Sequence, residues 1–373
     1  MPKKCIELNA RIVCAATVAG HKEKEGPLGE GFDLCDPTDR FGSKTWESAE
    51  GEMQRMALNL ALSKAECKVE DIGALFAGDL QNQCVGSSYG LLSFDIPYLG
   101  LYGACSTCAE SLLLASVMVT HGIYDRCAAV TSSHYCAAER QYRTPIEYGA
   151  QRPPTAQWTV TGAGAFIVCN ADADPSPSGA YIRRALPGIV IEKGINDANN
   201  MGAAMAPAAL DTLTRFFEET GTRPEAYDAI VTGDLGFEGG TILEELMEAA
   251  GYPMGDRYTD CGQLIFYRTE QDVHCGGSGC GCSAIVLGAH LLPKLASGEW
   301  SRILFMPTGA MMSPDSLKQG QSIPAVAHLL ELERLPKRDN LQAIAQNDCH
   351  TYQSEPQSAR QVSLGSELPI DLS

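Results

Sequence analysis

A short pattern occurs twice in this chain, 155 residues apart, and it constrains the fold more than any other feature. Residues 70–82 read EDIGALFAGDLQN, and residues 225–237 read EAYDAIVTGDLGF. Five positions match: Glu70, Ala74, Gly78, Asp79 and Leu80 correspond to Glu225, Ala229, Gly233, Asp234 and Leu235. Each copy follows a helix-like segment and is an apolar, strand-like run that ends in Gly-Asp-Leu. The chain is therefore predicted to contain one α/β unit twice.

The similarity continues along each half. In the first half, a turn at 102–108 is followed by a helical pattern and then, after Gly122, by an apolar strand. In the second half, a turn at 275–282 is followed by the same elements, with Gly298 before the strand. In both halves a glycine closes the helix. Units of this length exceed solenoid repeats and indicate a duplicated α/β domain with mixed sheets covered by helices.

Changes in composition along the chain predict the boundaries between the two halves and the C-terminal tail. A segment punctuated by proline, DADPSPSG at 172–179, separates the halves. We therefore predict an N-terminal half at 1–175 and a C-terminal half at 176–335. The tail, 336–373, is polar and without sustained periodicity. We predict that this tail is disordered or loosely attached.

The net charge of −18 argues against two classes of partner. An acidic surface repels nucleic acids and the anionic headgroups of membranes. We see no signal peptide, and the longest strongly apolar run, 111–119, is about half of the ~20 residues that a membrane span needs. Attachment to a membrane would therefore need a protein partner. The 15 scattered cysteines predict reduced thiols in a cytosol rather than a disulfide framework.

Cys105 lies in the turn before the first-half helix, in the sequence LYGACSTC. A cysteine at a helix N-terminus faces unpaired N–H groups and the positive end of the helix dipole, and both favour a nucleophilic thiolate. A buried structural cysteine explains the local pattern equally well. A redox pair with Cys108, or a zinc site that adds Cys280 and Cys282, is a lesser alternative because the usual context and spacing are missing.

The second-half turn, QDVHCGGSGCGCS at 271–283, is the second candidate. Closely spaced glycines let a backbone approach a ligand and present N–H donors to it. His274 beside this turn could act as a base or a hydrogen-bond donor. A histidine that only satisfies neighbouring carbonyl groups is an equally good interpretation.

An arginine-rich segment at 139–164 is the third candidate. It contains Arg140, Arg143 and Arg152, and planar guanidinium groups suit carboxylates. Its Tyr142 and Trp158 could stack on an aromatic ring. Salt bridges between domains or subunits are the alternative use of these arginines.

Seven long and unusual strings are spread over about residues 1–335: YGACST, AERQYRTPIEYGAQRPPTAQWTVTGAGA, NNMGAAMAPAA, VTGDLG, QDVHCGGSGCGCSA, TGAMMSP and SIPAVAH. In these strings the chain resembles the stage V sporulation protein AD family of the thiolase superfamily. The resemblance implies a thiolase-like, duplicated αβαβα five-layer fold and a homodimer. It also implies binding of dipicolinic acid, with or without calcium, for its uptake into the developing spore. Membrane proteins of the same sporulation operon would hold the chain at the cytoplasmic side of the forespore membrane.

The departures from the enzymes of this superfamily bear on chemistry. Cys105 stands at the position of their nucleophile. Gly233 stands where ketoacyl synthases carry a histidine, and Gly277 stands where they carry an asparagine. A nucleophile without these partners lacks the groups that move protons and stabilise an oxyanion. We therefore expect no catalysis, with Cys105 a vestige of the nucleophile, and no cofactor or metal.

The resulting hypothesis is a binding protein on the scaffold of an enzyme. Its predicted ligand-binding residues are Cys105, Thr107, Arg152, Trp158, His274, Gly277 and Ser278. The alternative is an acyltransferase or condensing enzyme that uses Cys105 on a coenzyme A thioester. A purely architectural subunit that docks membrane partners is a third possibility, and it would need no preserved pocket.

Overall fold

The structure is a computed structural model that describes residues 4–142, 152–173 and 179–334, with no account of the side chains of 139–142. Residues 1–335 cluster into one compact unit. The predicted tail at 336–373 lies outside the described residues, so its predicted disorder stays a prediction.

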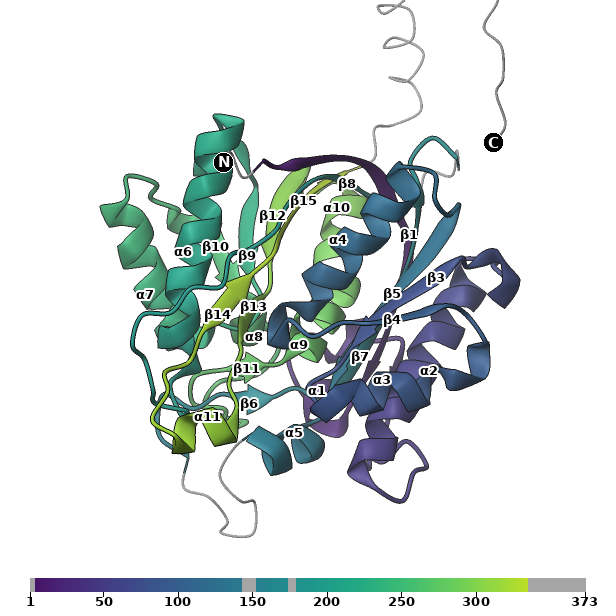
Figure 1. Ribbon diagram of the computed structural model, residues 1–373, viewed down its shortest axis with the longest axis horizontal. Helices are drawn as coiled ribbons and strands as arrows, with labels where there is room; N and C mark the ends of the chain where they lie inside the picture. Colours follow the sequence, from purple (N-terminus) through teal and green to yellow (C-terminus); the bar gives the residue numbers. More distant parts are fainter. Residues whose placement is uncertain (1–3, 143–151, 174–178, 335–373) are drawn as a thin grey trace, which may run out of the picture. The chain divides into compact units, whose positions relative to one another are not determined.

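Ten strands form one hydrogen-bonded path in the order β10-β9-β12-β15-β8-β1-β7-β5-β3-β4 (Figure 1). In the first half they are β1 (Ile6–Ala19), β3 (Ala74–Gly78), β4 (Tyr98–Gly100), β5 (Arg126–Ser133) and β7 (Gly162–Asn170). In the second half they are β8 (Ala180–Leu186), β9 (Ala229–Thr232), β10 (Tyr258–Asp260), β12 (Arg302–Met306) and β15 (Leu329–Arg334). The short β2 (Leu34–Cys35) lies off this path and pairs with β1.

The two halves of this path repeat each other. From β1 outward the order is β7, β5, β3, β4, and from β8 outward it is β15, β12, β9, β10. In each half the first two pairings are antiparallel and the last two are parallel. The two copies of the sequence pattern occupy equivalent strands, β3 and β9. The duplicated α/β fold is therefore confirmed, whereas the division at residue 175 stays a prediction.

Helices cover the half-sheets in layers (Figure 1). The longer ones are α2 (Trp46–Lys64), α4 (Thr107–Thr120), α6 (Met201–Thr220) and α7 (Gly236–Ala249). The second-half counterpart of α4 is a continuous run of α9 (Cys280–Val286), the π-helix η9 (Leu287–Leu291) and α10 (Leu292–Ser297). Shorter helices are α1 (His21–Lys24), α3 (Val85–Gly90), α5 (Tyr135–Tyr142), α8 (Cys261–Leu264) and α11 (Pro314–Lys318).

The alternation of side chains along the strands shows that the fold has five layers. Successive side chains of a strand point to opposite faces, and on β3 Phe76 joins the core around α4 and α9, whereas Leu75 joins the core under α2. On β12, Phe305 joins the same middle core, whereas Leu304 packs with α6. Both half-sheets therefore bury one face against the middle helices and the other against an outer helical layer.

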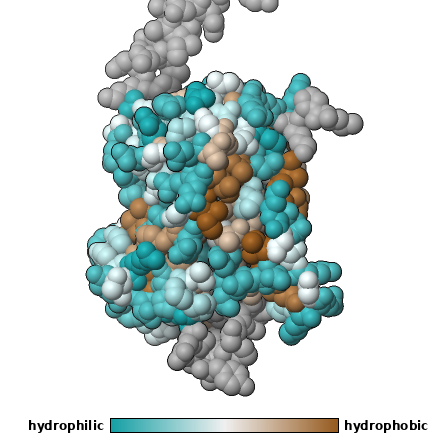
Figure 2. All heavy atoms as spheres, turned by 90° about the vertical axis from the view of Figure 1, so that its left-hand side faces the viewer, coloured by the Kyte–Doolittle hydropathy of each residue, from teal (hydrophilic) through white to brown (hydrophobic). Residues whose placement is uncertain are grey.

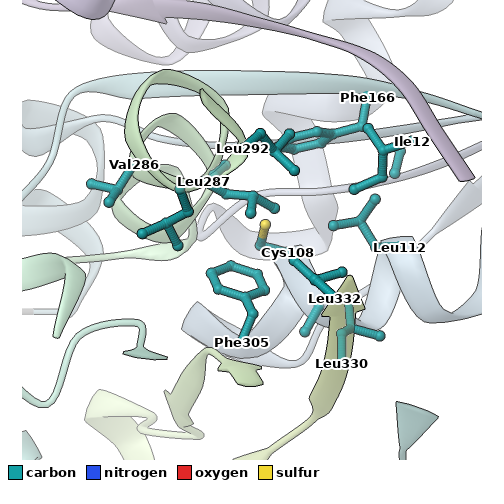
Figure 3. Close-up of a cluster of buried hydrophobic side chains, with 14 of the residues drawn as sticks. Ile12, Cys108, Leu112, Phe166, Val286, Leu287, Leu292, Phe305, Leu330 and Leu332 are labelled. Atoms are coloured by element: carbon teal, nitrogen blue, oxygen red, sulfur yellow. The ribbon is translucent and has the colours of Figure 1, made fainter. Parts of the chain in front are cut away.

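Figure 3 shows the middle layer, where Cys108 of α4 lies between Leu287 of η9 and Phe305 of β12, and Leu112 of α4 lies toward Ile12 of β1. The helical run 280–297 is long and apolar enough to cross a membrane by length and composition, although 61% of it is buried inside the fold. It is longer than the apolar run at 111–119 that stood out in the sequence. Its apolar character matches its place in the middle core. The face seen in Figure 2 is mostly hydrophilic, with a hydrophobic strip across its middle.

Candidate functional site

The turn that carries Cys105 is a 3-10 helix, η5 (Ala104–Ser106), leading directly into α4. Ala104 has a φ of 49°, a left-handed conformation that is uncommon without glycine. Thr107 holds this shape, because its Oγ1 donates to the carbonyl of Ala104 (2.7 Å) and accepts from the N–H of Gly103 (2.9 Å). Ser106 ties the turn to the second half by donating to the carbonyl of Pro307 (2.8 Å). Thr107, predicted as a ligand residue, therefore has a structural role in the turn.

A cavity of about 30 Å³ lies beside Cys105. Both halves line it, with Leu80, Tyr102, Ala104, Cys105, Ala138, Thr159, Met201, Ser278, Ala310 and Met312. None of these described lining residues carries a charge. Of the predicted ligand residues, Cys105 and Ser278 are in this lining. Tyr102, Thr159 and the two methionines were missed, because their convergence depends on contacts between segments far apart in the sequence.

A small parallel ladder brings Thr159 and Ser278 together. β6 (Trp158–Thr159) pairs with β11 (Gly277–Ser278), with Gly277 opposite Trp158. Asp234, from the second copy of Gly-Asp-Leu, supports this ladder, because its carboxylate accepts from the N–H of Gly279 (3.1 Å) and from Oγ1 of Thr308 (2.8 Å). The repeated aspartate thus has a physical function, which is to anchor the glycine turn.

The two glycines that replace enzymatic side chains are packed tightly. A Cβ atom at Gly233 would lie 2.8 Å from Cα of Pro307. A Cβ atom at Gly277 would lie 2.7 Å from Cγ2 of Ile265. Real Cβ atoms do not approach other atoms so closely, so neither position could hold an imidazole or an amide without moving its neighbours.

Arg152 and His274 meet at Asp272, which sequence reasoning did not single out. Nη2 of Arg152 donates to Oδ2 of Asp272 (2.9 Å), and Nε2 of His274 lies 3.0 Å from Oδ1. Nδ1 of His274 also lies 2.8 Å from the carbonyl of Pro153. We call these three side chains the Asp272 latch. The salt-bridge alternative thus describes Arg152, and neither Arg152 nor His274 is among the described residues that line the cavity.

Trp158 belongs to the surroundings of the latch. Its ring stacks on Tyr135 at 3.9 Å, with Nζ of Lys22 at 4.1 Å and the guanidinium carbon of Arg152 at 4.8 Å from the ring centre. Since neighbouring side chains on a strand alternate, Trp158 points to the face opposite Thr159 and the cavity. Arg143 and the side chain of Arg140 lie outside the described part of the chain.

The cysteines near Cys105 differ from it in environment. Burial raises the pKa of the Cys108 thiol to about 12 and that of the Cys280 and Cys282 thiols well above the ordinary value. Cys105 is 7% exposed and lines the cavity. Cys105 and Cys108 are not joined in a disulfide bond. Among the described residues, no three side chains of His, Cys, Asp or Glu come together as a metal site.

Comparison with solved structures identifies the fold of this chain. OleA of Xanthomonas campestris with bound cerulenin has a TM-score of 0.57 at 14% identity, over 88% of this chain and 97% of that one. 3-Oxoacyl-[acyl-carrier-protein] synthase III of Aquifex aeolicus VF5 has a TM-score of 0.52 at 11% identity, over 87% and 99%. Both are thiolase-like condensing enzymes, and at such identities the likeness shows the fold alone.

Comparison of sequences identifies the family. The family described as stage V sporulation protein AD (SpoVAD) matches residues 3–333. The stage V sporulation protein AD of Bacillus subtilis (strain 168) is 43% identical over 320 residues, which span 86% of this chain and 93% of that protein. The chain therefore belongs to the stage V sporulation protein AD family, as a sporulation protein with a thiolase-like fold.

Proposed function

We propose that this protein binds dipicolinic acid in the cavity beside Cys105, for uptake of dipicolinate into the developing spore. The observation that carries the proposal is the cavity itself. Both halves contribute to it, and it lies beside Cys105, which the family resemblance places at the position of the nucleophile in the enzymes of this superfamily. The family membership supplies the setting in sporulation.

The chemistry of the lining suits a flat aromatic acid. Leu80, Met201 and Met312 provide apolar contact for a pyridine ring, and Tyr102, Thr159 and Ser278 provide hydroxyl groups. The positive end of the α4 helix dipole lies at the Cys105 turn and favours one carboxylate there. A rigid ligand loses little entropy on binding. The cavity is smaller than dipicolinate, so we expect the flexible methionine side chains to move when the ligand enters.

Catalysis is not part of the proposal. The packing around Gly233 and Gly277 disfavours the histidine and asparagine with which condensing enzymes move protons and bind an oxyanion. The alternative, an acyltransferase that uses Cys105, would need another base. His274 is engaged in the Asp272 latch instead.

Calorimetric titration tests the proposal directly. We expect saturable, 1:1 binding of dipicolinate, with benzoate at least about tenfold weaker because it lacks the second carboxylate and its charge-assisted hydrogen bonds. Parallel titrations with calcium show whether the metal enters with the ligand. The enzymatic alternative predicts turnover of acetyl-coenzyme A that Cys105→Ala abolishes. Equal affinities for dipicolinate and benzoate would contradict the proposal.

We also propose a homodimer and attachment to membrane proteins of the same operon. Five exposed large hydrophobic residues cluster within a short stretch that includes the edge strand β4: Tyr89, Leu92, Tyr98, Leu99 and Tyr102. An open strand edge with apolar neighbours favours pairing with another chain. We expect light scattering to give twice the chain mass. A monomer at micromolar concentration would leave this surface to a different partner.

A further inference from the structure

Two buried acids, Glu50 and Asp79, belong to one polar network that adjoins Leu80, a residue of the Cys105 cavity lining. Glu50 of α2 accepts hydrogen bonds from Oγ of Ser132 and from Nε2 of Gln81, both at 2.8 Å. Asp79, from the first copy of Gly-Asp-Leu, accepts from the backbone N–H groups of Gln81 (2.8 Å) and Ser87 (2.7 Å) and from Oγ of Ser87 (2.5 Å). Glu50 and Asp79 are completely buried.

This network contains more acceptors than hydrogens. The amide nitrogen of Gln54 lies within hydrogen-bonding distance of three acceptors, in Gly78, Ser87 and Ser132. The amide oxygens of Gln54 and Gln81 are buried without a donor. Buried acceptors are almost always hydrogen-bonded, so these two amide oxygens call for a further donor. A proton on one carboxyl group would supply it, and a rotated amide of Gln81 could then accept that proton.

Glu50 is the better place for this proton. Asp79 is held by three donors, which stabilise its ionised form. Burial raises the pKa of both carboxyl groups above their ordinary ranges, and the neighbouring Asp79 carboxylate raises the pKa of Glu50 further. No lysine, arginine or histidine in the described ranges is paired with either acid. The pair therefore carries one negative charge while it holds the proton and two when it does not.

The network reaches the wall of the cavity. Leu80, which follows Asp79, lines the cavity and packs with Cys105 and Cys280 in a small buried cluster. Sγ of Cys280 donates to the carbonyl of Ser132 (2.9 Å), whose hydroxyl binds Glu50. The other titratable groups around the pair are Glu47 on α2, Cys84 in η3 (Asn82–Cys84), Tyr98 on β4, Glu110 on α4 and Cys280 on α9. The contacts from α3 and β5 are the neutral Ser87 and Ser132.

We propose that the protonation state of the Glu50–Asp79 pair controls whether the Cys105 cavity accepts an anion. An anion enters while Glu50 holds the proton, and loss of that proton expels the anion. None of the described lining residues is a cation that could offset a second buried negative charge. Ligand release would then accompany a rise in pH. The inference rests on the proposed function only for the identity of the anion.

The rates at which two alkylating reagents react with Cys105 test the proposed effect of the acid pair. This experiment does not need dipicolinate. Iodoacetamide is neutral and iodoacetate is an anion of similar size, so the ratio of their rates cancels the fraction of Cys105 present as thiolate. For the native protein we expect the iodoacetate-to-iodoacetamide ratio at the Cys105 peptide, followed by mass spectrometry, to fall by roughly threefold to thirtyfold between pH 6 and 10. A flat ratio in the native protein overturns the proposal.

Two variants test whether Glu50 causes the change in the alkylation ratio with pH. Glu50→Gln keeps the shape of the side chain and cannot ionise, so its ratio should stay constant with pH. Glu52→Gln, also on α2, removes a partly exposed charge paired with Arg55 and should retain the native profile. A pH-dependent ratio that persists in Glu50→Gln contradicts the assignment. If Glu50→Gln does not fold, the native profile decides.

Titration with dipicolinate separates this inference from the proposed function. We expect the affinity of the native protein to fall with rising pH, by up to about tenfold per pH unit, and that of Glu50→Gln to change little. Failure to bind at every pH contradicts the proposed ligand and leaves the alkylation result to decide on the acid pair. Binding with equal pH dependence in both proteins contradicts the inference alone.

Discussion

Replacing Ala310 by leucine is expected to weaken dipicolinate binding by at least about a hundredfold. Ala310 lines the cavity from β13 (Thr308–Ala310) and is 7% exposed. The strand approaches the Cys105 turn closely, since a Cβ atom at Gly309 would lie 2.2 Å from the carbonyl oxygen of Gly103. Leucine adds three carbon atoms to a cavity of about 30 Å³, so little space remains for a ring.

Calorimetry on folded protein measures this effect. Ala310→Ser serves as the control, because it keeps the size of the side chain and should leave the affinity within about threefold of native. Circular dichroism checks that the leucine variant is folded. Native affinity in a folded Ala310→Leu protein would place the ligand elsewhere, and the surroundings of the Asp272 latch would be the next site to examine.

Local patterns in the sequence predict the repeated order of strands and helices in the fold. The repeated Gly-Asp-Leu at 78–80 and 233–235 marked equivalent strands because each apolar run needs the same buried environment. Cys105 was found at the start of α4 because a glycine-rich turn before an apolar helix is a local signal. Both inferences use residues close together in the chain, where periodicity and turn chemistry are informative.

The candidate site was harder to predict because its geometry depends on long-range contacts. The guanidinium of Arg152 appeared suited to a carboxylate ligand, and it does bind a carboxylate, that of Asp272, 120 residues away. The alternation of Trp158 and Thr159 then puts the tryptophan and the cavity on opposite faces of β6. No local pattern indicates which carboxylate an arginine will bind, so the arginine clamp on dipicolinate stays a prediction without support from these contacts.

Replacing Glu331 by alanine is expected to destabilise the protein by about 3 kcal/mol or more. Glu331 of β15 is completely buried between two strands of the second half. Its carboxylate accepts from Nε of Arg302 on β12 (2.6 Å), from Nη1 of Arg184 on β8 (3.3 Å) and from the hydroxyl of Tyr227 (3.1 Å). Alanine would leave these donors and two partly buried cations without their shared partner.

Glu333 provides a matched control on the same strand. It also contacts Arg302, at 3.2 Å, and Arg183, at 3.3 Å, although its side chain is 29% exposed whereas that of Glu331 is 0% exposed. Water can solvate the arginines of an exposed ion pair after the carboxylate is removed. Glu333→Ala should therefore lower the free energy of unfolding by less than about 1 kcal/mol. Urea unfolding at pH 7 gives both values, provided that the slope with denaturant is unchanged. Equal losses in the two variants would mean that Arg184 and Arg302 are stabilised by their remaining partners, Glu7 and Glu333, and that burial of Glu331 contributes little.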